Sequence, residues 1–485
     1  MHNKKQYLFQ VLGPLLALLF WFVIDLDATN HNVSLMAGVA VWMCTWWFSE
    51  AVNLAITALV PIFALPLLGL SDAKQVAQQY SDSIIFLFIG GFMLAFAIEK
   101  WSFHKRIALR ILSMVGKSPA TILVGVMLST YLISNWISNT ATTMMLFSAV
   151  FALIQETKSF IDKHPQKFAS ALLLGLAFSA TIGGMATPVG TPPNMYFFKA
   201  FHAAFPDNTE LNFLTWSRIG YPISFLFLVV TYLVLYVYFI RHKVEFRIDK
   251  SYFKNNYRQL GAMSWEEKWV FVLFLLAILL WFTRTDIDFG TFTYHGWNHV
   301  FKVPKFIDDS FVAVVIALLL FLIPSKANRG QALLIWEDAK KLRYDIILMF
   351  GSGFALAYGF EISGLSNWLA AGLIALEGVS PLFIILGICV IVTLISEFAS
   401  NIASIQLAIP VMIALQKDLN LSPLLLMMPA TFAASLGFML PVATAANTIV
   451  FGTKQIHMRD MLKVGIVLDI AGILIITLLC YLYLH

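Results

Sequence analysis

The amino-acid sequence predicts an all-α polytopic membrane protein with about eleven transmembrane helices, two re-entrant hairpins and an inverted-topology repeat. Composition is the first observation behind this prediction. Of the 485 residues, 59% are hydrophobic and only 12% are charged, against about 25% charged residues in ordinary globular domains. A series of long apolar runs and a duplicated residue pattern are the other two. So few charges exclude a soluble enzyme, a nucleic-acid-binding protein and a disulfide-stabilised secreted scaffold.

Thirteen apolar runs are candidates for crossing the bilayer, which takes about 20 apolar residues per helix. They lie at 8–27, 34–50, 53–70, 83–99, 120–155, 168–204, 217–240, 267–283, 309–324, 344–362, 382–416, 422–453 and 463–483. The runs at 120–155, 168–204, 382–416 and 422–453 are long, and Asn, Gly, Pro or Ser interrupts each near its middle. Broken backbone at membrane depth needs protein or water to satisfy its N–H and C=O groups. These breaks are therefore where a functional site is expected.

The distribution of Lys and Arg predicts a cytoplasmic amino terminus and an external carboxyl terminus in the plasma (inner) membrane. If 120–155 and 382–416 are re-entrant hairpins, 25 of the 32 basic residues fall in cytoplasmic segments, as the positive-inside rule requires. The other seven are Lys74, Lys199, Arg218, Arg284, Lys302, Lys305 and Lys417. Making either hairpin a full crossing would move every downstream basic loop outside, so the hairpin interpretation is preferred.

Two parts of the chain repeat one pattern at an offset of 262 residues. Residues 83–99 (SIIFLFIGGFMLAFAIE) match 345–361 (DIILMFGSGFALAYGFE), and the same offset aligns Ser138-Asn139 with Ser400-Asn401. A third block, 188–194, aligns with 441–447 at an offset of 253. Five helices separate the starts of the two copies, so the copies have opposite topology. Inverted repeats are typical of secondary transporters, whose site lies at the repeat interface near the membrane midplane.

The repeat divides the chain into four predicted parts. Residues 1–82 hold the amino-terminal helices, and residues 83–240 form the first repeat with hairpin 120–155, a broken helix and a further helix. Residues 241–343 supply a connecting loop and two helices. Residues 344–485 form the second repeat, with hairpin 382–416, a second broken helix and the last helix.

Apart from Glu397, the four breaks carry neutral hydrogen-bonding residues that suit an anion together with a small cation. Their sequences are SNWISNTAT (134–142), SEFASNIAS (396–404), ATPVGTPPN (186–194) and LPVATAAN (440–447). A helix that restarts after a break points free N–H groups at a carboxylate or sulfate. Unwound carbonyls and Asn or Ser oxygens suit sodium. None of the breaks contains Lys or Arg, so a buried dianion would need helix ends and a co-bound cation to offset its desolvation.

The same residue types also have a purely structural use. Ser, Thr and Asn hydrogen-bond between membrane helices, and small residues allow close packing. The symmetric placement of four breaks in two inverted halves favours the functional interpretation. Glu397 is different, because Asn135 aligns with it in the first hairpin, and for this residue both interpretations stay open.

At these breaks the chain resembles the divalent anion/sodium symporter (DASS) family, the INDY-type di- and tricarboxylate transporters. The family has Ser-Asn-Thr at two hairpin tips, and this chain has Ser138-Asn139-Thr140 and Ser400-Asn401-Ile402. Residues 434–450 (ASLGFMLPVATAANTIV) look like its sodium-symporter signature. The resemblance implies a homodimer in which a scaffold domain, with residues 1–82 on the dimer side, holds a transport domain that moves as an elevator.

The resemblance also implies which residues bind sodium and substrate. The first sodium site would use Ser134, Ser138, Asn139 and Gly190, and the second Ser396, Ala399, Asn401 and Ala443. The substrate-binding positions would be Ser138, Asn139, Thr140, Thr191, Ser400, Asn401, Ile402 and Thr444. The chain departs from the family at Ile402, which stands for Thr, at Ala445-Ala446, which stand for Pro-Pro, and at Ser396, which stands for Thr.

These observations predict a secondary active transporter of C4 dicarboxylates of the succinate, malate and fumarate class, coupled to sodium as a symporter. A sodium-independent dicarboxylate exchanger, or citrate or sulfate as substrate, are the alternatives that the three departures leave open. The prediction includes no cofactor, no catalytic residue and no nucleic-acid partner. A membrane enzyme is disfavoured because the sequence has no HExxH, CxxC or paired carboxylates, and a channel needs no inverted breaks.

Overall fold

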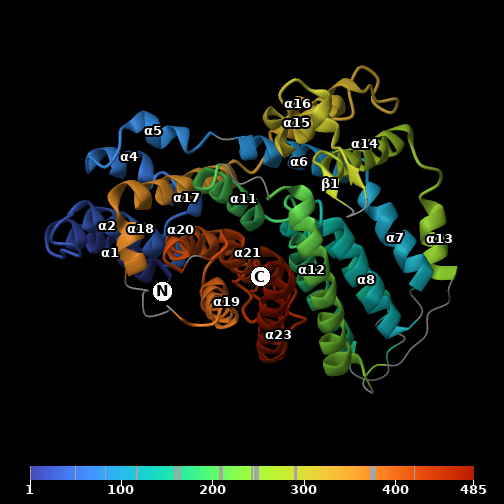
Figure 1. The fold of residues 1–485 in the computed structure, drawn as a ribbon. Coiled ribbons are helices and arrows are strands. Elements are labelled where there is room, and N and C mark those ends of the chain that lie inside the picture. Colours follow the sequence, from blue (N-terminus) through green and yellow to red (C-terminus); the bar gives the residue numbers. More distant parts are fainter. Residues whose placement is uncertain are drawn as a thin grey trace.

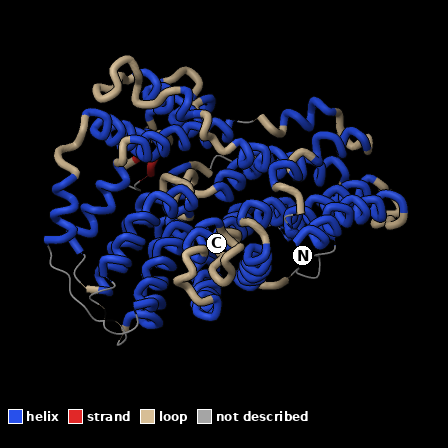
Figure 2. The backbone as a smooth tube through the Cα atoms, turned by 180° about the vertical axis from the view of Figure 1, so that it is seen from behind, coloured by secondary structure: helices blue, strands red, loops and turns tan. Residues whose placement is uncertain are grey.

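The structure is a computed structural model, and almost all of its elements are helices (Figure 1). It describes residues 2–49, 51–81, 83–115, 118–157, 161, 165–206, 211–241, 244, 251–288, 292–371, 378–419 and 421–484. The one strand pair in these residues is a small part of the chain, as the view from behind makes plain (Figure 2). The prediction of a helical membrane fold is therefore confirmed at this level.

The described amino-terminal part consists of seven helices, of which the first five lie on one side of the molecule and the last extends on the opposite side (Figure 1). They are α1 (His2–Phe22), α2 (Asn32–Ser49), α3 (Leu54–Thr57), α4 (Val60–Leu67), α5 (Ala73–Gln78), α6 (Ser83–Lys100) and α7 (Phe103–Val115). The apolar run predicted at 53–70 is thus divided between α3 and α4. Helices α6 and α7 meet at an angle of 66°, where Ser102 has a left-handed φ of 56°.

The first repeat contains five helices after α6 and α7. They are α8 (Pro119–Ser134), α9 (Asn139–Thr157), α10 (Pro165–Gly184), α11 (Pro192–Ala204) and α12 (Phe213–Leu235), which continues as the π-helix η2 (Tyr236–Ile240). Local sequence explains the start of α8. Ser118 and Thr121 form a capping box and Pro119 occupies the first helical position, where its missing N–H costs nothing.

The middle of the chain joins the two repeats through helices and a small strand pair. Its elements are α13 (Ser251–Gln259), α14 (Trp265–Phe282), β1 (Ile287–Asp288), β2 (Thr293–Tyr294), η3 (Trp297–Val300), η4 (Pro304–Phe306), α15 (Asp309–Leu322) and α16 (Trp336–Ala339). Strands β1 and β2 are antiparallel, with Ile287 opposite Tyr294. Helix α14 begins in a capping box between Ser264 and Glu267.

The second repeat follows the order of the first. Its helices are α17 (Tyr344–Ser363), α18 (Leu365–Ala371), α19 (Pro381–Phe398), α20 (Asn401–Leu419), α21 (Pro423–Ala433), α22 (Ala445–Phe451) and α23 (Met458–Leu484). Gly364, with φ of 81°, ends α17, a left-handed conformation that glycine adopts without steric cost.

Five described helices are long and apolar enough to cross a membrane. They are Pro165–Gly184, Phe213–Ile240, Tyr344–Ser363, Pro381–Phe398 and Met458–Leu484. The bent pair α6 and α7 could make a sixth, and shorter apolar helices accompany them at Gln6–Phe22, Leu54–Leu67, Pro119–Ser134, Asn139–Gln155, Asp309–Leu322, Asn401–Gln416 and Pro423–Ala433. These helices belong to an integral membrane protein. The number of eleven crossings stays a prediction.

The two halves of the chain pack on each other in a reciprocal way. Helix α9 of the first half lies against α22 of the second, and α20 of the second half lies against α11 of the first. The equivalent helices α12 and α23 pack directly on each other. Such an exchange of partners is what an internal two-fold relation between the predicted inverted copies would produce.

The two hairpin tips differ in the apolar clusters that they contact. Trp136, in the first tip, packs against the large cluster that runs through α6, α8–α12, α14, α15 and α19–α23. Ala399 and Ala403, in the second tip, are buried in a smaller cluster formed by α1, α2, α4, α5, α17 and α18. The second tip contacts both clusters, because Ile402 beside Ala403 packs against the large one.

Close contact between α6 and α15 leads to a prediction about stability. A Cβ at Gly90 would lie 2.5 Å from the carbonyl carbon and oxygen of Ala313, and backbone atoms cannot move aside as a flexible side chain can. We expect Gly90→Ala to cost about 1–3 kcal/mol of unfolding free energy. Thermal unfolding of the purified protein in detergent checks this.

Gly387 in α19 is the matched control, because a Cβ there would meet no atom within 4 Å. Gly387→Ala should leave the unfolding temperature unchanged or raise it, since alanine restricts the unfolded chain. Equal unfolding temperatures for the two variants would contradict the assigned packing of α6 on α15.

Candidate functional site

All four breaks expected from the sequence coincide with interruptions of helices. Helix α8 ends at Ser134 and α9 begins at Asn139, while α19 ends at Phe398 and α20 begins at Asn401. Helix α10 stops at Gly184 before α11, and α21 stops at Ala433 before α22. Each break therefore leaves a helix start exposed to its surroundings at the position where the sequence has Ser, Asn or Thr.

Ser134 and Asn139 meet at the first tip. The fully buried Ser134 hydroxyl donates to the carbonyl oxygen of Ala180, 2.6 Å away, and lies 3.0 Å from Asn139 Oδ1. The Asn139 amide Nδ2 donates to Thr191 Oγ1 at 3.5 Å. Asn139 thus connects the hairpin to the start of α11, with its oxygen on one side and its N–H group on the other.

The second tip repeats this geometry. The buried Ser396 hydroxyl donates to the carbonyl oxygen of Ala434 at 2.6 Å and lies 3.1 Å from Asn401 Oδ1. The serine-to-carbonyl and serine-to-asparagine distances therefore differ by no more than 0.1 Å between the two halves. This likeness in three dimensions follows from the 262-residue offset that aligns Ser134 with Ser396.

Hydroxyl groups cap several of the restarting helices. Ser138 accepts from the backbone N–H of Ala141 at 3.4 Å, and Ser400 accepts from that of Ala403 at 3.2 Å. Thr444 caps α22 by accepting from the N–H of Asn447 at 3.1 Å. Capping satisfies one of the free N–H groups at each helix start; the others remain as donors beside the breaks.

Two asparagines that the sequence analysis aligned, but to which it gave no role, hold the breaks together. Asn194 Nδ2 donates to the carbonyls of Gly184 (2.9 Å) and Thr187 (2.8 Å), and Asn447 Nδ2 donates to those of Gly437 (2.8 Å) and Leu440 (3.2 Å). Both side chains are fully buried. Their alignment at the end of the third repeat block was the signal that could have identified them.

Small residues let the first broken helix approach the tip. A Cβ at Gly184 would lie 2.3 Å from Asn139 Oδ1, and one at Gly190 would lie 2.6 Å from the carbonyl oxygen of Gly184. In the second half, Ala443 is buried and its N–H donates to Leu440 at 3.3 Å. Gly190 and Ala443, both expected sodium ligands, thus lie in equivalent breaks.

The remaining residues expected to bind sodium or substrate are Ala399, Thr140 and Ile402. Ala399 is buried and its N–H closes the end of α19 on Ile395 at 2.9 Å. Thr140 and Ile402 are half-buried, and Ile402 packs against the large apolar cluster. No hydrogen bond between described residues joins the Asn139 group to the Asn401 group, so the two tips are related by helix packing alone.

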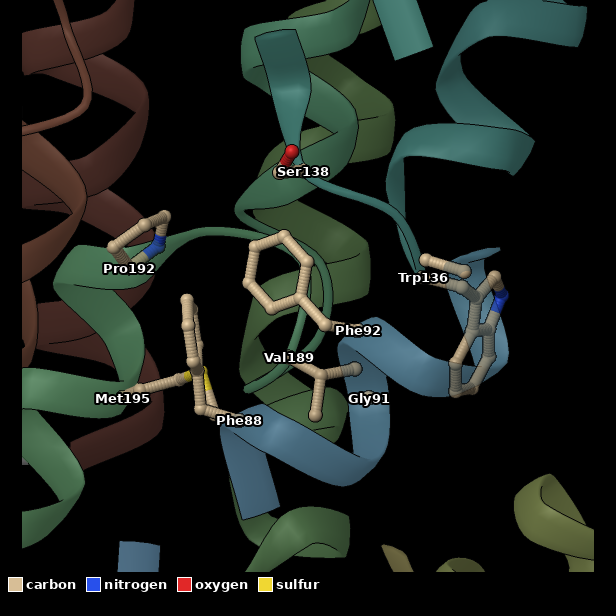
Figure 3. Close-up of a pocket in the computed structure, with 9 residues that line it drawn as sticks. Phe88, Gly91, Phe92, Trp136, Ser138, Val189, Pro192 and Met195 are labelled. Atoms are coloured by element: carbon tan, nitrogen blue, oxygen red, sulfur yellow. The ribbon is translucent and has the colours of Figure 1, made fainter. Parts of the chain in front are cut away.

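A small cavity opens beside the first tip. It is lined by Phe88, Gly91, Phe92, Ala95, Trp136, Ser138, Val189, Pro192 and Met195. Figure 3 shows the Ser138 hydroxyl above the Phe92 ring, with Pro192 and Met195 on one side and Trp136 on the other. The lining is apolar except for Ser138, so this cavity adjoins the polar tip and does not itself provide a charged site.

The two tips differ in their aromatic residues. Trp136 stacks with Phe213 of α12 and Trp281 of α14, with ring centroids 6.1 Å apart in both cases. Phe398, which aligns with Trp136, is 64% exposed. The first tip is therefore held by an aromatic stack on two helices, whereas the second has no equivalent stack among the described residues.

Glu397 takes a role that Asn135 cannot fill. Its carboxylate accepts from the backbone N–H groups of Met439 (2.9 Å) and Leu440 (3.1 Å) in the second break. In the first half, the Thr187 hydroxyl donates instead to the Asn135 carbonyl. Each break is thus tied to the base of its hairpin, by a carboxylate in one half and by a hydroxyl in the other.

The fold places two carboxyl groups from distant parts of the sequence near each other. Glu397 and Asp469 are both buried on α19 and α23, which pack on each other, and neither carboxylate oxygen of Asp469 has a hydrogen-bond partner among the described residues. The two residues are 72 positions apart and belong to different helices, so no local motif joins them. Two carboxyl groups buried close together away from water cannot both carry a charge cheaply.

Comparison with known proteins places the chain among transporters. The family described as the sodium:sulfate symporter transmembrane region matches residues 6–485. The sodium-dependent dicarboxylate transporter SdcS of Staphylococcus saprophyticus is 38% identical to the chain, over 99% of the chain and 92% of SdcS. The SdcS protein of Staphylococcus aureus is 36% identical, over 97% of the chain and 90% of that protein.

Two solved structures share the fold at low sequence identity. MtrF of Neisseria gonorrhoeae, described as belonging to a class of antimetabolite efflux pumps, superposes with a TM-score of 0.58 at 12% identity, over 85% of this chain and 83% of MtrF. The YdaH transporter of Alcanivorax borkumensis gives 0.54 at 14% identity, over 99% and 97%. These likenesses concern the fold alone.

The family match extends over nearly the whole chain, and the two SdcS relatives are similar to it from end to end. Both findings describe transporters, which agrees with the membrane helices and with the prediction that the protein is not an enzyme. The chain therefore belongs to the divalent anion/sodium symporter family.

Proposed function

We propose that this protein is a sodium-coupled symporter of C4 dicarboxylates of the succinate, malate and fumarate class. The observation that carries the proposal is the matched pair of neutral tips, Ser134 with Asn139 and Ser396 with Asn401, in breaks without Lys or Arg. An anion at such a site needs cations that enter with it. The names of the two SdcS relatives support the same ion and substrate class.

Each tip offers the oxygen atoms that a sodium ion prefers. The first sodium site would use Ser134, Ser138, Asn139 and the Gly190 carbonyl, and the second Ser396, Asn401 and the carbonyls of Ala399 and Ala443. Hard cations take carbonyl, amide and hydroxyl oxygens. The close approach of Gly184 to Asn139 and of Gly190 to Gly184 brings backbone carbonyls to the first tip without a side chain between them.

The amide of each tip asparagine can serve both ligands. Its oxygen faces the serine hydroxyl of the sodium site, and its N–H group can donate to a carboxylate. In the structure, the Asn139 N–H group donates to Thr191 instead. Substrate carboxylates would meet Ser138, Asn139, Thr140, Thr191, Ser400, Asn401 and Thr444, with Ile402 beside them. Helix starts at α9, α11 and α20 add backbone donors. One molecule reaching two tips needs two separated anionic groups, so a C4 dicarboxylate fits better than sulfate.

We also propose the membrane arrangement expected from the sequence. Eleven helices would cross the membrane with two re-entrant hairpins, the amino terminus in the cytoplasm and the carboxyl terminus outside. Helices α8–α12 and α19–α23 would form a transport domain that moves as an elevator within a homodimer, held by a scaffold of the other helices. The exchange of partners between α9, α22, α11 and α20 supports movement of both hairpins as one body.

Uptake of labelled succinate into proteoliposomes tests the proposed function. We expect an inward sodium gradient to drive accumulation several-fold above that in equimolar potassium, because the neutral site needs a co-bound cation. Citrate and sulfate serve as competing anions and should compete less well than malate or fumarate.

Two results would contradict this expectation in different ways. Equal uptake without sodium that requires internal dicarboxylate would replace symport with exchange, the alternative that Ile402 and Ala445-Ala446 leave open. Absence of transport for every di- and tricarboxylate would exclude the substrate class.

Asn139→Ala and Asn401→Ala should each reduce sodium-driven succinate uptake about tenfold or more. Each variant removes one sodium oxygen and one carboxylate donor, and a loss of 1.4 kcal/mol already gives a factor of ten. Initial uptake rates in proteoliposomes measure the loss, and thermal unfolding checks that the variants fold.

Asn53→Ala is the control for these variants. Asn53 also stands at a helix start, where it accepts from the N–H of Ala55 at 2.9 Å, but it lies outside the breaks. Its replacement should cost about 1 kcal/mol of stability and leave uptake intact. Uptake close to wild type in both tip variants would refute the site assignment.

Glu397→Gln should weaken the apparent sodium affinity of uptake by about tenfold. The glutamine oxygen can accept from the N–H group of only one of Met439 and Leu440, and the glutamine NH₂ group would face the N–H group of the other residue. The lost bond matters because hydrogen bonds to a charged acceptor are worth about 1.5–3 kcal/mol. The second break, which carries Ala443, would lose its fixed shape. The sodium concentration for half-maximal uptake is the measurement.

Glu361→Gln is the matched control, because Glu361 is exposed on α17. A Glu397→Gln variant that unfolds at lower temperature but keeps wild-type sodium dependence would make Glu397 a purely structural residue. That outcome would decide between the two interpretations that the sequence leaves open.

A further inference from the structure

Three potential metal ligands come together in the segment between α14 and α15, apart from the four breaks. One ligand atom from each of Asp286, His295 and His299 lies within 4.8 Å of the other two. Asp286 directly precedes β1, His295 directly follows β2, and His299 lies on η3. The pairing of β1 with β2 and the position of η3 therefore bring a carboxylate and two imidazoles to one point.

The distances between these atoms approach those of a metal centre. His299 Nε2 lies 2.9 Å from Asp286 Oδ1, and His295 Nδ1 lies 3.7 Å from Asp286 Oδ2. Zinc bonds of about 2.0–2.2 Å in a tetrahedron imply about 3.4 Å between neighbouring ligand atoms. Small rotations of two exposed histidines would bring the three atoms to this spacing.

The backbone that carries the ligands is fixed on the end of α14. The N–H groups of Trp297 and Asn298 donate to the carbonyls of Thr283 (3.2 Å) and Arg284 (3.3 Å). A Cβ at Gly296 would lie 2.1 Å from the Arg284 carbonyl oxygen, so this contact requires glycine. The segment that holds His295 and His299 is thus packed against Arg284 before any ion binds.

The carboxylate is also oriented in advance. The N–H of Gly296 donates to Asp286 Oδ1 at 2.8 Å. A ligand fixed by a hydrogen bond from its surroundings is typical of metal sites. Asp286 is therefore a ligand with a preset orientation.

We propose that Asp286, His295 and His299 form a binding site for one divalent transition-metal ion of the zinc class. Two imidazole nitrogens with one carboxylate oxygen suit zinc and disfavour calcium or magnesium, which take oxygen ligands. The side chains of Asp286, His295 and His299 are 44%, 75% and 51% exposed, so an ion can enter and keep water in the fourth position. The proposal is independent of the transport function.

Metal titration of the chelator-stripped protein tests this site, with an affinity tag that contains no histidine. Isothermal titration with zinc should show one saturable site per chain, and cobalt should give the visible absorption bands of a four-coordinate centre. His295→Ala, His299→Ala and Asp286→Asn should each weaken zinc binding by at least tenfold. Zinc should also raise the unfolding temperature of the wild type but not of these variants.

His31→Ala is the matched control. His31 is an exposed histidine 3.9 Å from Asp25, a pair outside the one three-ligand group found among the described residues. This variant should bind zinc as the wild type does. Absence of saturable zinc binding, or binding that the three ligand variants leave unchanged, would overturn the proposal, and so would displacement of zinc by equimolar calcium. Sodium-driven uptake by metal-free His295→Ala should equal that of the wild type, which keeps this test separate from the transport function.

Discussion

The cost of burying a doubly charged anion away from any cationic side chain is the constraint on which the site depends. Such an ion loses its hydration, and in the absence of Lys or Arg only oriented dipoles and a second, mobile ion can replace it. The four breaks supply the dipoles, because each restarts a helix whose first N–H groups lack partners within the helix. In the proposed site the cations have to come from solution, so sodium coupling follows from the lack of Lys and Arg in the breaks.

The same constraint explains why the breaks are so heavily tied together by neutral contacts. Ser134 and Ser396 each bond a carbonyl of a broken helix, and Asn194 and Asn447 each donate to two carbonyls within a break. These bonds satisfy backbone groups that membrane lipid cannot. The two halves differ in the bond that ties each break to its hairpin. In the second half, Glu397 replaces the contact that Thr187 makes with Asn135 in the first.

Sequence analysis could locate the breaks and the equivalent Ser and Asn positions, because both are encoded in short stretches of chain and repeated at constant offsets. It could not find the proximity of Glu397 and Asp469, which depends on how α19 and α23 pack. None of the apolar runs predicted from the sequence covers residues 103–115, which form α7. A surface helix with basic residues on one face has too few apolar residues to register as a membrane crossing.

The divergence between the tips bears on how the two halves could respond to ions. Trp136 stacks with both Phe213 and Trp281, so reshaping the first tip would disturb rings on α12 and α14. Phe398 has most of its surface exposed, and the second tip is secured mainly by the buried carboxylate of Glu397. Aromatic stacking does not depend on charge, whereas a carboxylate beside an ion site interacts directly with a cation. The second half is therefore the one whose shape should respond more strongly to sodium, although the oxygen atoms at the two tips are arranged alike.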